Sequence, residues 1–271
     1  MSDTVLWLLG EPPVQVDPST PVVRADDLGL LRGESVFETL RVAGGQARFV
    51  DAHLSRLVRS ARRLALDLPR GWEQLVADAV SSYGLDDGVL RLVCTKGGVG
   101  FALLTPVPAE TLRGRVEGLT AATLTLGVPA GLRAQAPWLL GGVKSTSYAV
   151  NMASLRTVDA DEVIWLSSDG EVLEAPTSTV CWVSGGHLVT PPADEVGVLA
   201  GTTMQVALSV CPVPYDVRRG TAEELRAAEE VLLLSSVRGV APVVELDGRR
   251  LGRGPVGRAL SAAFETALLD G

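Results

Sequence analysis

The stretch Gly141-Gly142-Val143-Lys144-Ser145-Thr146-Ser147-Tyr148 carries one of only two lysines in the chain. The other is Lys96, and arginine supplies the remaining 22 of the 24 basic residues. Arginine stays protonated and is not a nucleophile, whereas a lysine amine can act as one in suitable surroundings. Scarcity marks Lys144 as a candidate for chemistry. An ordinary loop lysine is the alternative, because the codon bias of a GC-rich genome would also make lysine rare.

The composition is that of a globular protein: 271 residues, 46% apolar and 21% charged. This length allows one large domain or two of moderate size. The net charge of −8 argues against a nucleic-acid partner, because binding to phosphates needs a basic surface. No apolar run reaches the ~18 residues of a membrane span, and the N-terminus lacks the basic region of a signal peptide. We therefore expect a cytoplasmic protein that has no membrane partner.

Cysteine and histidine usage indicates neither a disulfide framework nor a metal site. Cys94, Cys181 and Cys211 are odd in number and widely spaced, and their spacing from His53 and His187 matches no zinc motif. We expect all three cysteines to be buried thiols.

Apolar periodicity and turn residues predict two α+β domains, each with strands packed against helices. We place the N-terminal domain at 1–107, a Pro- and charge-rich linker at 108–118, and the C-terminal domain at 119–271. Residues 25–35 read as irregular, and Asp51 reads as the N-cap of the first long helix. Further expected elements are strands at 5–9, 36–42, 47–50, 88–95, 119–126, 162–167 and 231–234, strands within 172–183 around 174–177, and helices at 72–83, 147–160, 201–210, 221–228 and 254–269.

Four further features could carry chemistry, although each has a simpler interpretation by itself. Arg56 belongs to a helix with several other arginines, which is typical of a solvated face. Glu174 follows a predicted hairpin and could be an edge-strand charge. Gly201-Thr202-Thr203 opens a helix, where free N–H groups and hydroxyls bind anions or merely cap the helix. Ser236 follows a buried strand. Together with Lys144, these residues supply an amine, an acid and an anion-binding site, which are the groups that a pyridoxal-phosphate enzyme needs.

In this order, the residues resemble the fold-type IV pyridoxal-phosphate enzymes, or class IV aminotransferase family. This family comprises branched-chain aminotransferases, D-amino-acid aminotransferases and 4-amino-4-deoxychorismate lyase. The matching segments are Val36-Phe37-Glu38-Thr39, Ala52-His53-Leu54-Ser55-Arg56-Leu57, Leu173-Glu174-Ala175, Leu199-Ala200-Gly201-Thr202-Thr203 and Ala241-Pro242-Val243 with Asp247-Gly248. The resemblance covers nearly the whole chain and implies the two-domain fold of D-amino-acid aminotransferases.

The resemblance also implies the cofactor, pyridoxal 5′-phosphate, and a role for each site residue. Lys144 would form the Schiff base with the cofactor, and Glu174 would pair with its pyridine nitrogen. The phosphate would be held by Arg56, in a two-pronged contact, and by Gly201, Thr202, Thr203 and Ser236. Tyr148 would contact the phenolic oxygen, although it stands one position earlier than in the branched-chain enzymes. Substrate contacts are expected from Arg91, Lys96 and Thr39.

Within the family, the segment from Lys144 to Ala153 looks most like that of aminodeoxychorismate lyases. Such an enzyme would form 4-aminobenzoate, a folate precursor, and pyruvate. The alternatives are an aminotransferase for branched-chain or D-amino acids, which would take a small-molecule amine, and a catalytically inactive binding protein with the same fold. The resemblance also implies a homodimer.

Overall fold

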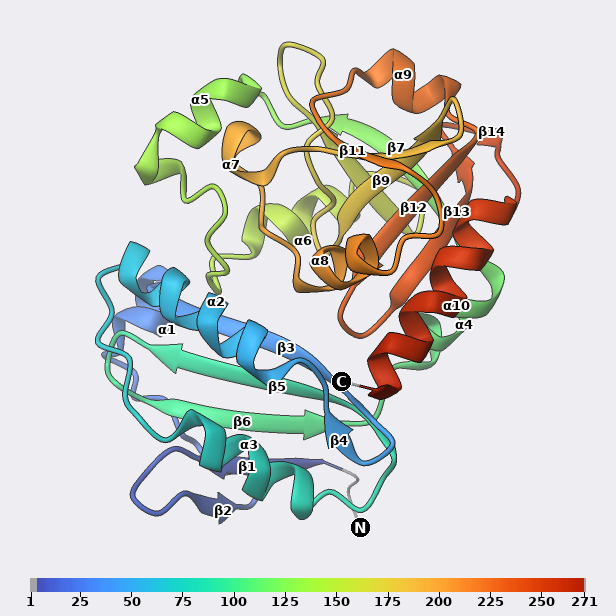
Figure 1. Ribbon diagram of the computed structural model, residues 1–271. Helices are drawn as coiled ribbons and strands as arrows, with labels where there is room; N and C mark the ends of the chain where they lie inside the picture. Colours follow the sequence, from blue (N-terminus) through green and yellow to red (C-terminus); the bar gives the residue numbers. More distant parts are fainter. Residues whose placement is uncertain (1–3, 271) are drawn as a thin grey trace. The chain divides into compact units, whose positions relative to one another are not determined.

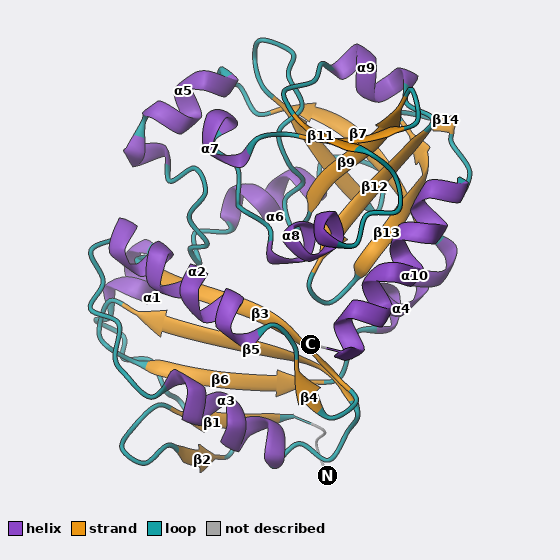
Figure 2. Cartoon of the chain, in the orientation of Figure 1, coloured by secondary structure: helices purple, strands orange, loops and turns teal. Residues whose placement is uncertain are grey.

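The structure, a computed structural model, describes residues 4–270. The chain divides into two compact units, and each combines a β-sheet with helices, so the predicted α+β class is confirmed (Figures 1 and 2). The first unit holds the described residues of Met1–Pro108, Val143–Tyr148 and Leu268–Gly271, and the second holds Ala109–Gly142 and Ala149–Ala267. The Lys144 segment therefore groups with the first unit, whereas the predicted boundaries place it in the C-terminal domain.

The first unit is built on a six-stranded sheet with the order β2-β1-β6-β5-β3-β4, in which all neighbours are antiparallel. The strands are β1 (Val5–Leu8), β2 (Val14–Val16), β3 (Ser35–Ala43), β4 (Gln46–Ala47), β5 (Asp87–Thr95) and β6 (Gly100–Thr105). The helices are α1 (Leu28–Arg32), α2 (Val50–Arg63) and α3 (Trp72–Ser81).

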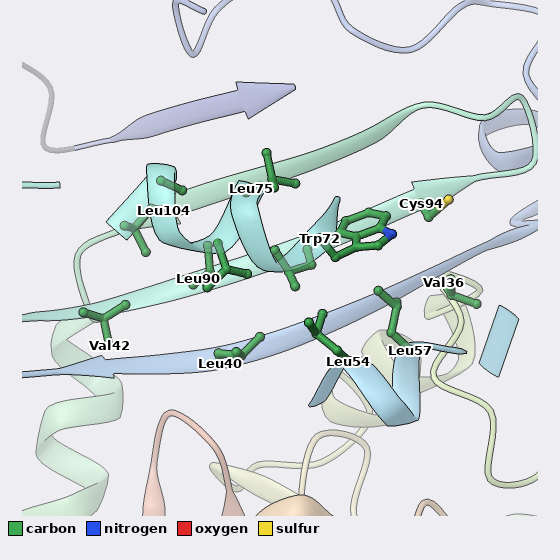
Figure 3. Close-up of a cluster of buried hydrophobic side chains, with 14 of the residues drawn as sticks. Val36, Leu40, Val42, Leu54, Leu57, Trp72, Leu75, Leu90, Cys94 and Leu104 are labelled. Atoms are coloured by element: carbon green, nitrogen blue, oxygen red, sulfur yellow. The ribbon is translucent and has the colours of Figure 1, made fainter. Parts of the chain in front are cut away.

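Alternation along β3 decides which of its residues enter the core. Side chains two apart on a strand share a face, and Val36, Leu40 and Val42 all pack into the core of this unit. Figure 3 shows this cluster, with side chains of α2 and α3 against those of the sheet. Its labelled members are Val36, Leu40, Val42, Leu54, Leu57, Trp72, Leu75, Leu90, Cys94 and Leu104.

Three local predictions in the first unit are wrong. Helix α2 begins at Val50, and its N-cap is Phe49 in the left-handed conformation (φ 56°), so Asp51 lies in the first turn. An acid is favourable in either place, because the helix dipole attracts negative charge over the whole first turn. The predicted return strand at 47–50 ends at Ala47, since the chain turns at Phe49. Residues 28–32 form α1 rather than irregular chain, capped by the Asp27 carboxylate, which accepts from Gly29 N.

The second unit contains an eight-stranded sheet with the order β11-β10-β9-β12-β13-β7-β8, and β14 pairs with β13. The strands are β7 (Leu119–Thr125), β8 (Glu162–Leu166), β9 (Thr179–Ser184), β10 (His187–Thr190), β11 (Tyr215–Val217), β12 (Glu230–Ser235), β13 (Gly239–Leu246) and β14 (Arg249–Arg250). The helices are α4 (Ala109–Glu117), α5 (Ala130–Gln135), α6 (Ala149–Leu155), α7 (Ala193–Val196), α8 (Thr202–Ser209), α9 (Ala222–Ala227) and α10 (Pro255–Asp270), with a 3₁₀ turn at Pro137–Leu139.

Several elements of the second unit differ from prediction. Helix α4 lies within the predicted linker 108–118, and it packs against β13. Helix α6 covers only 149–155 of the predicted 147–160. Strands are predicted on either side of 174–177, and only the second of them, β9, is a regular strand. Between them Ala175 N donates to Ser178 O in a turn, and Pro176 has no N–H to give to a sheet. Glu174 thus lies in a turn-bearing segment before β9, not in a regular edge strand.

The burial of the cysteines and the length and polarity of the helices complete the description of the fold. Cys94 and Cys181 are buried as expected, and burial raises the pKa of the Cys94 thiol to about 11, but Cys211 is only half-buried. Within the described residues, no helix is both long and apolar enough to cross a membrane.

Candidate active site

The backbone around Lys144 extends the sheet of the first unit. Phe37 N donates to Lys144 O at 3.1 Å, and Thr146 N donates to Ser35 O at 3.0 Å. The bridge between Val36 and Ser145 is antiparallel. Strand β4 pairs only with the other end of β3, so this segment occupies the edge that β4 leaves open. The main chain of Lys144 is therefore held in a sheet, although no regular strand is assigned there.

Two aromatic rings line the side chain of Lys144. Its Nζ atom lies 4.5 Å from the centroid of Phe37 and 6.0 Å from that of Tyr148. The two rings contact each other edge to face at 5.1 Å. Aromatic faces attract an ammonium group and exclude water from one side of it. The predicted neighbour Tyr148 is thus close to Lys144, and its contact with a cofactor oxygen stays a prediction.

A buried cluster of charged side chains is formed by Glu38 of β3 and by His53 and Arg56 of α2. Glu38, fully buried, accepts from Arg56 Nε at Oε1 and from Arg56 Nη2 at Oε2, both at 2.7 Å. His53 Nδ1 lies 2.7 Å from Glu38 Oε2 and donates to it, since a carboxylate only accepts. Burial alone would raise the pKa of Glu38, but the contacts with Arg56 and His53 lower it to about 2. Burial lowers the pKa of His53 below its usual value, and the charges of Arg56 and Lys144 act in the same direction, against the contact with Glu38, which raises it.

This geometry limits how Arg56 can act. Its Nε–Nη2 edge lies on Glu38, so the predicted two-pronged phosphate contact would have to use the Nη1–Nη2 edge. Glu38 is not among the predicted site residues. The signal was present in the sequence, because Glu38 shares a strand face with Val36 and Leu40, and a charge on an apolar face needs a partner.

The three predicted substrate contacts do not gather in one place. Thr39 and Arg91 are paired directly across β3 and β5. The Arg91 guanidinium lies 5.7 Å from the Phe37 ring centroid, so these residues share a sheet face. By contrast, Lys96 Nζ donates to Ala65 O at 2.6 Å. A substrate contact for Lys96 would require it to leave this hydrogen bond.

In the second unit, the Glu174 carboxylate has a donor on each oxygen. Arg133 Nη2 lies 2.9 Å from Oε1, and Leu199 N donates to Oε2 at 3.0 Å. Both side chains of the ion pair are largely buried. The carboxylate is consequently fixed in orientation, and each oxygen retains a lone pair for a further donor.

The start of α8 has the construction of an anion site. Its N-cap is Gly201, which has no side chain to cap the N–H groups of the first turn, and Thr202 and Thr203 are buried in that turn. A Cβ built at Gly201 would lie 2.3 Å from Thr179 Oγ1, so the position has no room for a side chain.

The turn between β12 and β13 carries Ser236 and is held by two arginines. Arg115 of α4 donates from both Nε and Nη2 to Val237 O. Arg238 Nη1 lies 3.3 Å from Oε2 of the buried Glu162 and 3.1 Å from Ser178 Oγ. Ser178 follows Glu174 in the same segment, so this network joins the Ser236 turn to the chain that carries the acid.

Comparison with known proteins gives this arrangement a family. The sequence model described as amino-transferase class IV matches residues 35–246. A bifunctional aminodeoxychorismate lyase / D-amino acid transaminase from Mycobacterium tuberculosis is 38% identical over an alignment of 280 residues. The alignment covers 94% of this chain and 96% of the relative. The chain belongs to the class IV aminotransferase family.

Solved structures of class IV aminotransferases agree with the fold. A hypothetical aminotransferase from M. tuberculosis in its PLP-bound form has a TM-score of 0.92 at 36% identity, covering 98% of this chain and 99% of the other. A fold IV transaminase from Curtobacterium pusillum has a TM-score of 0.90 at 34% identity, with 99% of each chain covered. The predicted family, fold and enzyme class are confirmed.

The cofactor of the class IV aminotransferases is pyridoxal 5′-phosphate, and the prediction of this cofactor is confirmed. The donor set of the chain fits it. The first unit supplies an amine beside aromatic rings and a buried arginine. The second supplies an oriented carboxylate and a helix N-terminus that has a glycine and two hydroxyls. The role of each residue stays a prediction.

Proposed function

We propose that this class IV aminotransferase is an aminodeoxychorismate lyase, which cleaves 4-amino-4-deoxychorismate into 4-aminobenzoate and pyruvate. The observation that carries the proposal is the 38% identity, over 94% of the chain, to a relative named as a lyase that is also a D-amino acid transaminase. The lyase-like segment from Lys144 to Ala153 supports the same choice.

Lys144 and Glu174 are the catalytic residues of the proposal. Bound pyridoxal phosphate supplies the electron-accepting ring that makes the chemistry possible. Lys144 would bind the cofactor and, once its Nζ atom is released, would move a proton at the substrate carbon that bears the amine. The Phe37 ring, whose centroid lies 4.5 Å from Nζ, shields one side of this amine from water. Glu174 would hold the proton on the ring nitrogen, since its carboxylate is already oriented by two donors.

The remaining predicted residues bind and orient. Arg56 and Ser236, with Gly201, Thr202 and Thr203 at the start of α8, would hold the phosphate. Tyr148 would contact the phenolic oxygen. Arg91 is suited to a substrate carboxylate, because its guanidinium lies on the same sheet face as Thr39. Lys96 is a weaker candidate because of its hydrogen bond with Ala65 O.

Product analysis tests the proposal directly. Purified protein loaded with pyridoxal phosphate should form 4-aminobenzoate and pyruvate in equal amounts from 4-amino-4-deoxychorismate, without an amino acceptor. Lys144→Ala should form neither product, and borohydride should no longer fix the cofactor to the protein. No product from wild-type protein that does bind the cofactor would reject the lyase. Cofactor fixed at a lysine in the Lys144→Ala variant would reject the assigned residue.

D-amino acid transamination is the second candidate, because the relative's name includes it and a D-alanine aminotransferase of Staphylococcus aureus is 27% identical over 92% of this chain. Incubation with D-alanine and 2-oxoglutarate should then give pyruvate and D-glutamate. Leucine tests the branched-chain alternative, which is suggested by a putative branched-chain aminotransferase at 28% identity. Turnover of leucine but of neither other substrate would select that alternative.

We also propose a homodimer, on the family resemblance alone. Light scattering of the purified protein should give about twice the 28.4 kDa mass of one chain. A mass of 28.4 kDa would reject it.

A further inference from the structure

Arg133 is the residue that fixes the Glu174 side chain. Its Nη2 atom lies 2.9 Å from Glu174 Oε1, and the two side chains are 14% and 12% exposed. An ion pair shielded from water to this degree is stronger and more rigid than an exposed one. With Leu199 N on Oε2, the carboxylate has one favoured orientation.

Arg133 is itself held firmly. Its guanidinium lies 5.9 Å from the ring centroid of Trp165. Trp165 and Glu174 are linked, because Trp165 N donates to Glu174 O at 2.8 Å. The backbone of α5 also lies close to two glycines. A Cβ at Gly197 would lie 2.6 Å from Ala134 N, and one at Gly141 would lie 2.9 Å from Arg133 O. Arg133 therefore contacts both Glu174 and the tryptophan that is hydrogen-bonded to it.

The hydrogen bonds of Arg133 indicate what it serves. Buried arginines in structural roles normally satisfy their N–H groups with several acceptors. Among the described residues, the buried Nη1 atom of Arg133 has no hydrogen-bond partner. The guanidinium thus gives its charge-assisted bond to Glu174 and leaves another buried group unsatisfied.

We infer that Arg133 is a positioning residue, which holds the Glu174 carboxylate in the orientation needed to bind the ring nitrogen of the cofactor. The inference rests on the proposed role of Glu174. Arg133 does not touch the cofactor in this scheme. It restricts rotation of the Glu174 carboxylate, and each oxygen keeps a lone pair that could accept a hydrogen bond from the ring nitrogen of the cofactor.

The test compares two ligands of the apo-protein: pyridoxal phosphate and its 1-deaza analogue, which has carbon in place of the ring nitrogen. The ratio of their dissociation constants measures how well the protein recognises that nitrogen. Arg133→Met keeps most of the aliphatic stem and removes the charged guanidinium that lies over Trp165. We expect this variant to lower the preference for pyridoxal phosphate by about tenfold. Combined with Glu174→Gln, it should cause no further loss, because Arg133 acts through Glu174.

A second readout is the split between kcat and KM in the lyase assay. Arg133→Met should lower kcat by roughly tenfold and leave KM within about twofold, since no substrate contact is removed. The matched control is Arg219→Met, which removes an exposed arginine from its pair with Glu171 in the same unit. It should leave both the ligand ratio and kcat unchanged. Arg133→Lys keeps the charge and should restore the ratio to within about threefold of wild type. If Arg133→Met does not fold, Arg133→Gln, which also removes the charge, replaces it.

The outcomes separate the inference from the proposal beneath it. A preference that Glu174→Gln abolishes and Arg133→Met leaves unchanged or increases would overturn the role of Arg133 alone. An additive loss in the double variant would overturn it as well, because Arg133 would then act independently of Glu174. A preference that survives Glu174→Gln would instead reject the assigned role of Glu174.

Discussion

Two glutamate–arginine pairs, one in each unit, differ in the burial of the carboxylate and in the number of side-chain donors that it accepts from. Glu38 and Arg56 share two hydrogen bonds of 2.7 Å, His53 adds a third, and the carboxylate is fully buried. Glu174 and Arg133 share one contact of 2.9 Å, and Leu199 N completes it.

This difference in burial indicates that the Glu38 carboxylate is structural and that the Glu174 carboxylate is available to a ligand. Glu38 accepts hydrogen bonds from Arg56 and His53, so removing it leaves the buried Arg56 guanidinium without its counter-charge. Glu174 retains some exposure and acceptor capacity for a ligand. We therefore expect changes in the first pair to alter stability most, and changes in the second to alter turnover most.

Glu38→Ala should have the largest effect on stability. Breaking a buried ion pair on one side costs about 3–5 kcal/mol, because the remaining charge is left uncompensated. Urea unfolding of the apo-protein, followed by tryptophan fluorescence, measures the loss. A loss of less than about 1 kcal/mol, the range of exposed pairs, would show that the cluster does not stabilise the first unit.

Acid should erase the contribution of Glu38. Its pKa is about 2 in the folded protein against an ordinary value of 4.5. A lowered carboxyl pKa contributes stability above the unfolded value and loses it as pH falls toward the folded value. The difference in unfolding free energy between wild type and Glu38→Gln should therefore shrink by roughly 3 kcal/mol between pH 5 and pH 2. A difference that stays constant over this range would contradict the lowered pKa.

Glu174→Ala should invert the pattern of Glu38→Ala. We expect kcat of the holoenzyme to fall by roughly 100-fold, the cost of removing one preorganised electrostatic contact. Stability should fall by about 1–3 kcal/mol, less than in Glu38→Ala, because the Glu174 carboxylate accepts one bond from Arg133 and one from the backbone and is not fully buried. Steady-state kinetics and urea unfolding on the same preparation compare the two. Near-normal kcat with a large loss of stability would make Glu174 a structural residue.

Arg238→Met should give an intermediate loss of stability, about 1–3 kcal/mol. It removes one partner of the buried Glu162, which keeps its hydrogen bond from Thr177 Oγ1 at 2.8 Å. The remaining donor is the reason for a smaller effect than in Glu38→Ala. Urea unfolding measures this loss too, and one as large as that of Glu38→Ala would mean that the hydroxyl does not compensate the carboxylate.

Local patterns in the sequence predict part of this picture. The amphipathic spacing of α2 and the alternation of β3 predict the core of the first unit, and the family motifs predict the fold. The Glu38 cluster could also have been found, because His53 and Arg56 are three apart on one helix face and Glu38 lies on an apolar strand face.

Other contacts leave no periodic signal. Arg133 and Glu174 lie 41 positions apart, with α6 and β8 between them in the chain. The addition of residues 144–146 to the edge of β3 joins segments more than 100 positions apart. Both depend on tertiary packing, which decides contacts that neither propensity nor spacing encodes.

His187→Ala should have the smallest effect and sets the scale for the others. His187 Nδ1 lies 3.1 Å from Asp216 Oδ2, but the side chains are 47% and 46% exposed. Water already solvates both groups, so the pair gains little by forming. We expect the unfolding free energy to change by less than about 0.5 kcal/mol and kcat to remain unchanged. A loss comparable to that of Arg238→Met would show that burial is not what ranks these pairs.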